Sequence, residues 1–232
     1  MINLSKEESS RQLSERKVKL EKVILNKEEL NRNVSRVAVV MDYSGSMRKM
    51  YNEGVVQAIL ERLLPIAMKF DDNGEMELWM FDNSFRRLPN ISLDNFYGYV
   101  KREILDKNYH MGTTNYAPVM EDIMKKYLEE DPAKITNLVL FITDGANADK
   151  PASTKAIIKA SHHPIFWQFI GIGGAKFDFL EKLDDLEGRY VDNANFFAID
   201  DLDSLSDSEL YDLLLAEYPG WLKYPEVKAM IK

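Results

Sequence analysis

Two short apolar runs, each ending close to an aspartate, constrain this chain most. Residues 37–41 read Val-Ala-Val-Val-Met and precede Asp42, and residues 138–142 read Leu-Val-Leu-Phe-Ile and lead through Thr143 to Asp144. Strands that are apolar on both alternating faces are typical of the buried interior of a parallel sheet. Open α/β sheets place their ligands at the carboxyl ends of such strands. The two aspartates are therefore predicted to lie at the functional edge of one sheet.

Strand-like and helix-like segments alternate along most of the chain. This alternation predicts an α/β fold, a doubly wound, mostly parallel β-sheet flanked by helices. Pro65 is expected to kink or shorten the helix that contains it. The further strands are expected at residues 75–81, 85–88 (a short edge strand), 165–170 and 195–199, and helices at 52–70, 92–105, about 118–130, 151–160 with Asp149 as its cap, 177–183 and 202–217.

The chain divides into three parts: an N-terminal extension at residues 1–33, a domain at 34–218 and a C-terminal tail at 219–232. Ser5 and Glu8 have the spacing of a capping box, which predicts a helix from about Lys6. Residues 1–36 carry nine Lys or Arg and six Asp or Glu, a net charge of +3. The extension is expected to pack as a helix on the flank of the domain, and a docking arm for an acidic partner is the alternative.

Composition excludes several classes of protein. Hydrophobic residues make up 45% and charged residues 29% of the chain, as in an ordinary soluble globular protein. No apolar stretch approaches the roughly 20 residues that span a bilayer, and the polar N-terminus lacks the apolar segment of a secretory signal. With no cysteine in the chain, a cytoplasmic location is expected. A net charge of −8 argues against binding of nucleic acid.

The segment Asp42-Tyr43-Ser44-Gly45-Ser46 has the donors of a metal site. One carboxylate and two hydroxyls at alternate positions form a half-shell of hard oxygen atoms, which suits Mg²⁺ or Mn²⁺. Thr114, in a glycine- and hydroxyl-containing loop before a helix, and Asp144 add donors of the same kind. The candidate metal ligands are therefore Asp42, Ser44, Ser46, Thr114 and Asp144, and Tyr43, Tyr116 and His110 are candidate residues of a partner-binding rim.

This set of residues, in this order, resembles the von Willebrand factor A (vWA) domain and its metal-ion-dependent adhesion site (MIDAS). The family pattern is Asp-x-Ser-x-Ser, then a Thr, then an Asp. Asp42, Ser44 and Ser46 match its first part, Thr114 its second and Asp144 its third. The sequence is similar to the bacterial tellurite-resistance (Ter) and copine-like branch of this family in three segments, Gly-Thr-Thr-Asn-Tyr-Ala-Pro-Val, Phe-Ile-Thr-Asp-Gly and Tyr-Pro-Gly-Trp-Leu.

The resemblance implies a Rossmann-like vWA fold and a binding module without catalytic activity. The two serines and Thr114 would bind a metal ion directly, and Asp42 and Asp144 partly through water. Two carboxylates beside a divalent ion leave the site near neutral, so that it accepts an acidic side chain from a partner protein. A bacterial stress or tellurite-resistance system is the expected setting.

Three other interpretations remain open. Asp42, Ser44 and Ser46 have the residue types that cap helices, and capping alone would need no metal. An aspartate after a central strand also suits a metal-dependent hydrolase or phosphatase, although Ser44 stands where the aspartate-nucleophile phosphatases need a second acid. A scaffold without a functional metal is the third. Residues 178–217 hold thirteen acids and two bases, which indicates a solvated face or a surface for a basic partner.

Overall fold

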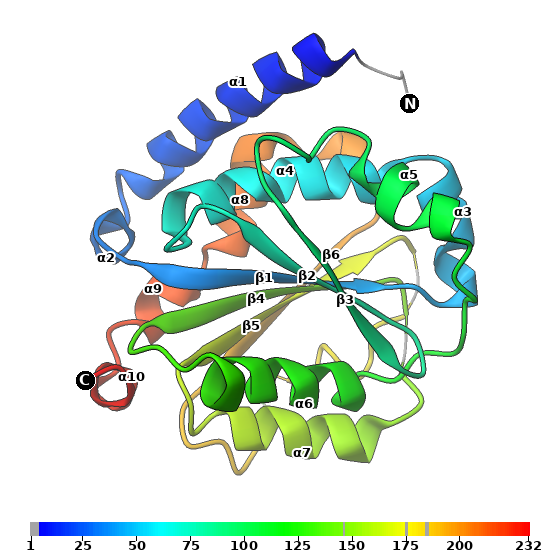
Figure 1. Cartoon of the computed structure of the whole chain (residues 1–232). Coiled ribbons are helices and arrows are strands. Elements are labelled where there is room, and N and C mark those ends of the chain that lie inside the picture. Colours follow the sequence, from blue (N-terminus) through cyan, green and yellow to red (C-terminus); the bar gives the residue numbers. More distant parts are fainter. Residues whose placement is uncertain (1–4, 146, 175, 184–185) are drawn as a thin grey trace.

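A computed structural model of the chain describes residues 5–145, 147–174, 176–183 and 186–232, and its centre is a six-stranded β-sheet. The strands lie in the order β3-β2-β1-β4-β5-β6 (Figure 1). All neighbouring pairs are parallel except β2 and β3, which are antiparallel at one edge. The strands are β1 (Ser35–Asp42), β2 (Met76–Phe81), β3 (Phe85–Ile91), β4 (Thr136–Thr143), β5 (Ile165–Ile172) and β6 (Ala194–Ile199). The predicted doubly wound, mostly parallel sheet is confirmed.

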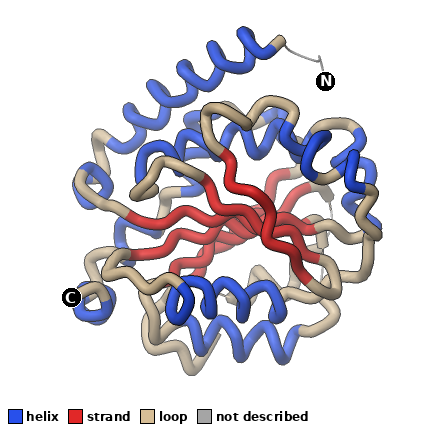
Figure 2. The backbone as a smooth tube through the Cα atoms, in the orientation of Figure 1, coloured by secondary structure: helices blue, strands red, loops and turns tan. Residues whose placement is uncertain are grey.

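Helices cover both faces of this sheet, as Figure 2 shows in blue against the red strands. One face is covered by α6 (Ala117–Lys125) and α7 (Lys150–Ala160). The other face carries α3 (Arg48–Asn52), α4 (Val55–Phe70), α5 (Tyr99–Glu103) and α8 (Asp207–Leu214), with α1 (Lys6–Ile24) outside them. The shorter elements are α2 (Glu28–Asn31), α9 (Tyr218–Trp221), α10 (Pro225–Met230), the 3-10 turns η1 (Gly45–Met47), η2 (Leu105–Lys107) and η4 (Leu202–Ser204), and the π-helical turn η3 (Lys126–Glu130).

The central strand β1 serves both hydrophobic cores. Val37, Val39 and Met41 belong to the core beneath α4, and Ala38 and Val40 belong to the core beneath α6. Because side chains alternate across a strand, a run that is apolar at every position has no face left for water. β4 is likewise buried at all eight of its positions. Both strands that lead to the predicted site are thus held rigidly in the interior.

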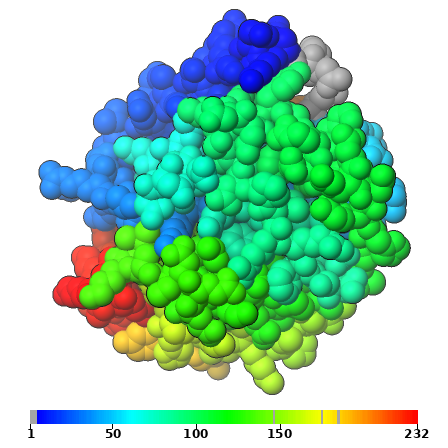
Figure 3. All heavy atoms as spheres, in the orientation of Figure 1, coloured from blue at the N-terminus to red at the C-terminus, as the bar shows by residue number. Residues whose placement is uncertain are grey.

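The N-terminal extension forms α1, which contacts α4 and α8. Figure 3 shows this blue segment along one side of the molecule. Ser5 and Glu8 form the predicted capping box. Leu13 and Leu20 are buried against the domain. Arg62 of α4 donates to the Leu202 carbonyl at 2.9 Å and pairs with Asp207 at 2.9 Å, and Lys19 of α1 also pairs with Asp207. The described part of the extension, from residue 5 on, is therefore packed on the flank of the domain.

Three predicted helices are shorter in the structure or absent from it. Of residues 92–105, only α5 is an α-helix, since turns around Ser92 and Asn95 occupy the start of the segment. Residues 178–182 form consecutive turns instead of a helix, and the buried Phe177, Leu180 and Leu183 recur at three-residue steps that turns also satisfy. The last predicted helix is reduced to η4 and α8. Conversely, α4 continues past Pro65 to Phe70, against the predicted shortening.

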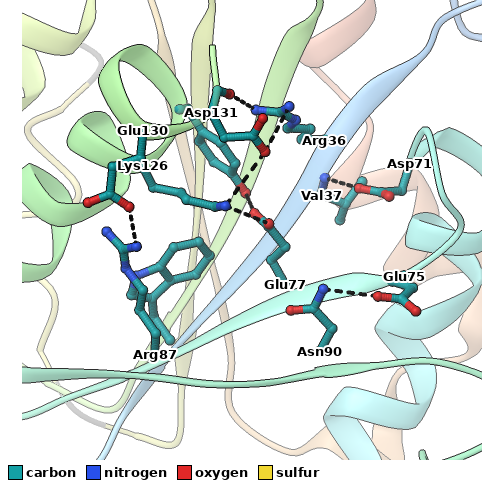
Figure 4. Close-up of polar contacts among 12 residues, drawn as sticks. Arg36, Val37, Asp71, Glu75, Glu77, Arg87, Asn90, Lys126, Glu130 and Asp131 are labelled. Atoms are coloured by element: carbon teal, nitrogen blue, oxygen red, sulfur yellow. Dashed lines mark hydrogen bonds and ion pairs between the residues drawn. The ribbon is translucent and has the colours of Figure 1, made fainter. Parts of the chain in front are cut away.

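Ion pairs and hydrogen bonds fix the amino ends of the strands (Figure 4). Arg36 of β1 pairs with Asp131 at 3.0 Å, and Lys126 lies between Asp131 and Glu77 of β2 at 3.6 and 3.9 Å. Asp71 accepts a hydrogen bond from the Val37 backbone N–H at 2.7 Å. Side chains thus tie the first residues of β1 and β2 to the π-helical turn after α6 and to the end of α4. The loops of the predicted site lie at the opposite, carboxyl ends of the strands.

The segment expected as a C-terminal tail folds into α9 and α10. Tyr218 and Trp221 are buried against Phe166 of β5. The Tyr218 hydroxyl lies 2.6 Å from the Ser35 hydroxyl, at the start of β1. Within the described residues, no helix is both long and apolar enough to cross a lipid bilayer.

Candidate metal centre

Asp42 and Asp144 meet at one edge of the sheet because β1 and β4 are parallel neighbours, with Met41 opposite Ile142. The Asp42 side chain is fully buried. Its Oδ1 accepts the backbone N–H of Ser44 at 2.8 Å, and its Oδ2 accepts the hydroxyl of Thr143 at 2.7 Å. The Tyr51 hydroxyl donates to the Asp42 carbonyl at 3.0 Å. Asp42 is therefore locked in one orientation.

Three of the predicted ligands form a continuous row of oxygen atoms. The Oγ atoms of Ser44 and Ser46 lie 3.0 Å apart, and the Ser46 hydroxyl donates to Oδ1 of Asp144 at 2.8 Å. Ser46 is exposed and Asp144 half-buried, so the row opens toward solvent. The loop after β1 and the end of β4 thus bring together hydroxyl and carboxylate donors that lie about a hundred residues apart in the sequence.

The loop that carries Thr114 is held between the other two loops. Gly112 forms an isolated parallel bridge with Ser44, and the Thr114 carbonyl accepts the N–H of Ala148 at 2.8 Å. A side chain at Gly112 would collide with the Asn83 side chain, since an added Cβ would lie 2.1 Å from its Oδ1. In the described part of the chain, the Thr114 hydroxyl has no hydrogen-bond partner. Backbone contacts thus join the Thr114 loop to the loops after β1 and β4.

Asp149 joins two of these loops. Its carboxylate accepts the backbone N–H groups of Tyr116 at 3.0 Å and Ala117 at 2.8 Å, at the start of α6. The side chains of Asn147 and Ser153 also donate to it. As predicted, Asp149 is the N-cap residue of α7, but its carboxylate makes no cap hydrogen bond to the backbone of α7 and accepts from the first N–H groups of α6 instead. The loop after Asp144 therefore fixes the start of α6 and, with it, the Thr114 loop.

The two site carboxylates repel a negative charge and attract a positive one. Burial raises the pKa of Asp42 to about 6, even though the hydrogen bonds from Ser44 and Thr143 favour the charged form, and Asp144 adds repulsion. Burial also raises the pKa of Asp144. Two acids held this close are relieved by a bound cation. Within the described residues, no three His, Asp or Glu side chains gather as a metal site, so a cation here depends on the hydroxyls as well.

The predicted rim residues differ in their accessibility. Tyr116 is fully buried, and its hydroxyl donates to the Gly145 carbonyl at 2.6 Å. Tyr43 is 4% exposed, packs edge-on against Tyr51 and donates to the Tyr109 carbonyl. The prediction that both tyrosines frame a partner is therefore corrected for Tyr116, which has no exposed surface. Tyr43 uses its hydroxyl inside the protein but still lines a small pocket of about 80 Å³ together with the exposed His110.

Sequence reasoning missed three residues that support the ligands: Thr143, Tyr51 and Asp149. Thr143 could have been found from the sequence, because a hydroxyl residue at the end of β4 lies next to the end of β1 in any parallel pairing of the two strands. Tyr51 and Asp149 carry no local signal. Their roles arise from how α3 and α6 pack against the strand ends.

Sequence comparison identifies relatives of this chain. The family described as "vWA found in TerF C terminus" matches residues 34–231. An uncharacterized protein of Bacillus subtilis, YcbR, is 47% identical over 214 residues, which is 91% of this chain and 87% of that protein. The nicotinic receptor-associated protein 1 of Caenorhabditis elegans is 36% identical over 75 residues, only 12% of its own length.

Solved structures share the fold. A von Willebrand factor type A protein from Catenulispora acidiphila superposes with a TM-score of 0.55 at 15% identity, covering 81% of this chain and 43% of that one. A mussel byssus protein, proximal thread matrix protein 1 with a zinc-occupied MIDAS motif, gives a TM-score of 0.54 at 17% identity over 79% of this chain and 46% of its own. With the match to residues 34–231, these findings show that the chain belongs to the von Willebrand factor A domain family, in its TerF-like group.

Proposed function

We propose that this protein is a binding module that recognises an acidic side chain of a partner protein through a divalent metal ion. Asp42, Ser44, Ser46, Thr114 and Asp144 would hold the ion as a MIDAS. The observation that carries the proposal is the approach of the Ser46 Oγ to the Asp144 Oδ1 at 2.8 Å and to the Ser44 Oγ at 3.0 Å. Hydroxyl and carboxylate oxygens from separate loops thereby meet at the carboxyl ends of the buried strands β1 and β4.

The chemistry of these oxygens favours Mg²⁺ or Mn²⁺, and their spacing, although also that of ordinary hydrogen bonds, is compatible with such an ion. An octahedral Mg²⁺ with metal–oxygen distances of about 2.0–2.1 Å has neighbouring ligands about 2.8–3.0 Å apart. The two oxygen–oxygen distances in the row, 2.8 and 3.0 Å, agree with this value. An all-oxygen donor set also suits these hard ions better than Zn²⁺, which prefers nitrogen and sulfur. Because the mussel protein holds zinc in its MIDAS, Zn²⁺ belongs among the ions to be tested.

Charge and geometry support recognition of an acid. Both Asp42 carboxylate oxygens already accept hydrogen bonds from the protein, so this residue would act chiefly through water and through its charge. The charge of a divalent ion balances the charges of the Asp42 and Asp144 carboxylates, so the site would not repel a third carboxylate from a partner. The ion would supply an open coordination position for the partner's carboxylate. Nothing in the donor set provides a nucleophile or an activated base, and the proposal includes no catalytic step.

For the setting of this activity we propose a bacterial stress or tellurite-resistance system, a proposal that membership of the TerF-like group supports. We place the protein in the cytoplasm, since the chain has no cysteine. Members of the vWA family commonly mediate protein interactions, which agrees with a binding role.

Binding of a carboxylate ligand separates the proposal from its alternatives. A capped peptide with one Glu should bind the wild type in the presence of Mg²⁺, and binding should be lost with chelator or in Asp42→Ala. Equal binding with and without metal would point to a metal-free scaffold. Turnover of a generic phosphoester that disappears in Asp42→Ala would instead indicate a metal-dependent hydrolase.

A further inference from the structure

A small polar pocket adjoins the candidate metal centre. It has a volume of about 80 Å³ and is lined by Tyr43, Met80, Phe81, Asp82, Ser84, Phe85, Arg86 and His110. Tyr43 lies between two of the predicted ligands in the sequence, and the Asp82 carbonyl accepts the N–H of Asn115, next to Thr114. The lining residues Tyr43 and Asp82 therefore connect the pocket to the loops that carry the predicted metal ligands.

The charged side chains of the pocket are not equivalent. The Arg86 guanidinium lies over the Tyr109 ring, 4.7 Å from its centroid, and is exposed. Among the residues that the structure describes, no acid forms an ion pair with it. The Asp82 carboxylate, by contrast, accepts the Ser84 N–H at 2.8 Å and packs against Gly112. The acid of the pocket is engaged within the protein, and its arginine is presented to solvent.

Acidic residues follow the carboxyl end of β6, on the far side of the metal ligands from the pocket. Asp200, Asp201 and Asp203 follow β6 directly and are exposed, and the strand order places β6 at the opposite side of the sheet from β2 and β3. The metal ligands after β1 and β4 lie between the two. An acidic segment bound at the centre would be repelled by the acids after β6 and attracted toward Arg86.

We propose that the Arg86 pocket binds a second carboxylate of the partner protein, so that the partner presents two acidic side chains, one to the metal site and one to Arg86. This inference rests on the proposed function. The pocket volume of about 80 Å³ lies between the roughly 30 Å³ that one water occupies in the liquid and the roughly 150 Å³ of a cavity that binds benzene. It suits a carboxylate group, and an arginine fork matches a carboxylate with two parallel hydrogen bonds.

A peptide series tests this pairing. Capped peptides of Gly and Ser would carry one Glu, with a second Glu one to four residues away, and matched peptides would carry Gln at the second position. NMR titration of the Mg²⁺-loaded protein would give the affinities. We expect one spacing to bind about three- to tenfold tighter than its Gln counterpart, a gain between that of an exposed ion pair and that of a charge-assisted hydrogen bond. Arg86→Gln should abolish this gain.

Arg11→Gln, an identical substitution on the exposed face of α1, serves as the control and should keep the gain. Equal affinities of the Glu and Gln peptides at every spacing, or a gain that survives in Arg86→Gln, would overturn the inference while leaving metal-dependent binding of the single-Glu peptide intact. Absence of any Mg²⁺-dependent peptide binding would overturn the proposed function and this inference together.

Discussion

The hydroxyl of Thr143 donates to the Oδ2 of Asp42 at 2.7 Å, across the two central strands of the sheet. The contact joins the last residues of β4 and β1, one residue before Asp144. It supports the charged form of a buried acid in the candidate metal centre. Stability and metal binding are therefore expected to depend on the same few hydrogen bonds.

Thr143→Val should weaken metal binding while keeping the shape of the core. Valine removes the hydroxyl donor, and a group that hydrogen-bonds to a metal ligand is typically worth about tenfold or more in metal affinity. The loss of a hydrogen bond to a charged group should also lower the free energy of unfolding of the metal-free protein at pH 7 by about 1.5–3 kcal/mol. Calorimetric titration of Mg²⁺ would measure the first effect and urea denaturation the second.

Thr143→Ser, which keeps the hydroxyl, should restore most of the Mg²⁺ affinity. Wild-type affinity in Thr143→Val would show that the contact with Asp42 does not support the site.

Asp42 should contribute a loss of stability to the metal-free protein as the pH rises from about 4 to 7. The folded-state pKa of Asp42, about 6, lies above its unfolded value of about 3.9. The folded state thus binds the proton more tightly, and its advantage is complete below the unfolded pKa and lost as the pH passes the folded one. At about 1.4 kcal/mol per pKa unit, the loss is on the order of 3 kcal/mol.

Asp71, whose pKa burial also raises to about 6, contributes a slope of the same sign. Urea denaturation of metal-stripped wild type and Asp42→Asn across this pH range would isolate Asp42, since Asp71 is common to both. The wild type should show the steeper loss. Equal slopes would contradict the account of Asp42 as a buried acid destabilised by its own charge.

Asp149→Ala should affect stability and metal binding together. Removing its carboxylate leaves the N–H groups of Tyr116 and Ala117 without their acceptor, and loss of such a cap costs about 1–2 kcal/mol. Because the Thr114 loop loses its anchor, the Mg²⁺ affinity should fall as well. Thermal unfolding and calorimetric titration would report the two effects.

Asp201→Ala is the matched control, since the Asp201 side chain accepts the N–H of Asp203 in an exposed turn away from the ligands. It should leave the Mg²⁺ affinity unchanged. If Asp149→Ala and Asp201→Ala lowered the Mg²⁺ affinity equally, the result would contradict a specific role of Asp149 in holding the Thr114 loop.

Asp207→Ala should destabilise the packing of α1 and α8 on α4. Arg62, whose side chain is 8% exposed, would keep its charge and lose the partner at 2.9 Å. Breaking such a buried pair costs about 3 kcal/mol, the lower end of the range for buried pairs, because Arg62 still donates to the Leu202 and Leu205 carbonyls. Asp212→Ala breaks an exposed pair with Lys27 and should cost less than about 1 kcal/mol. Equal costs by urea denaturation would contradict this ranking.

The sequence allowed the sheet and the order of the ligands to be predicted because both depend on local patterns. The apolar runs of β1 and β4 identify central strands, and in parallel neighbours the residues that follow must meet at one edge. The hydrogen bonds from the start of α6 to the Asp149 carboxylate were not predicted. An aspartate before α7 is explained equally well as the cap of α7 alone, so the residue type does not reveal a second helix as its partner. The two tyrosines were misplaced because their burial depends on acceptors, Gly145 and Tyr109, that only the folded chain supplies.

The most direct test of the central claim is calorimetric titration of Mg²⁺ and Mn²⁺ into chelator-stripped protein, with Asp42→Ala in parallel. The account predicts about one bound ion per wild-type chain, no binding by the variant, and a melting temperature of the wild type that rises with metal concentration. Wild-type protein that binds neither ion, or a variant that binds them as tightly as the wild type, would contradict a metal site built on Asp42.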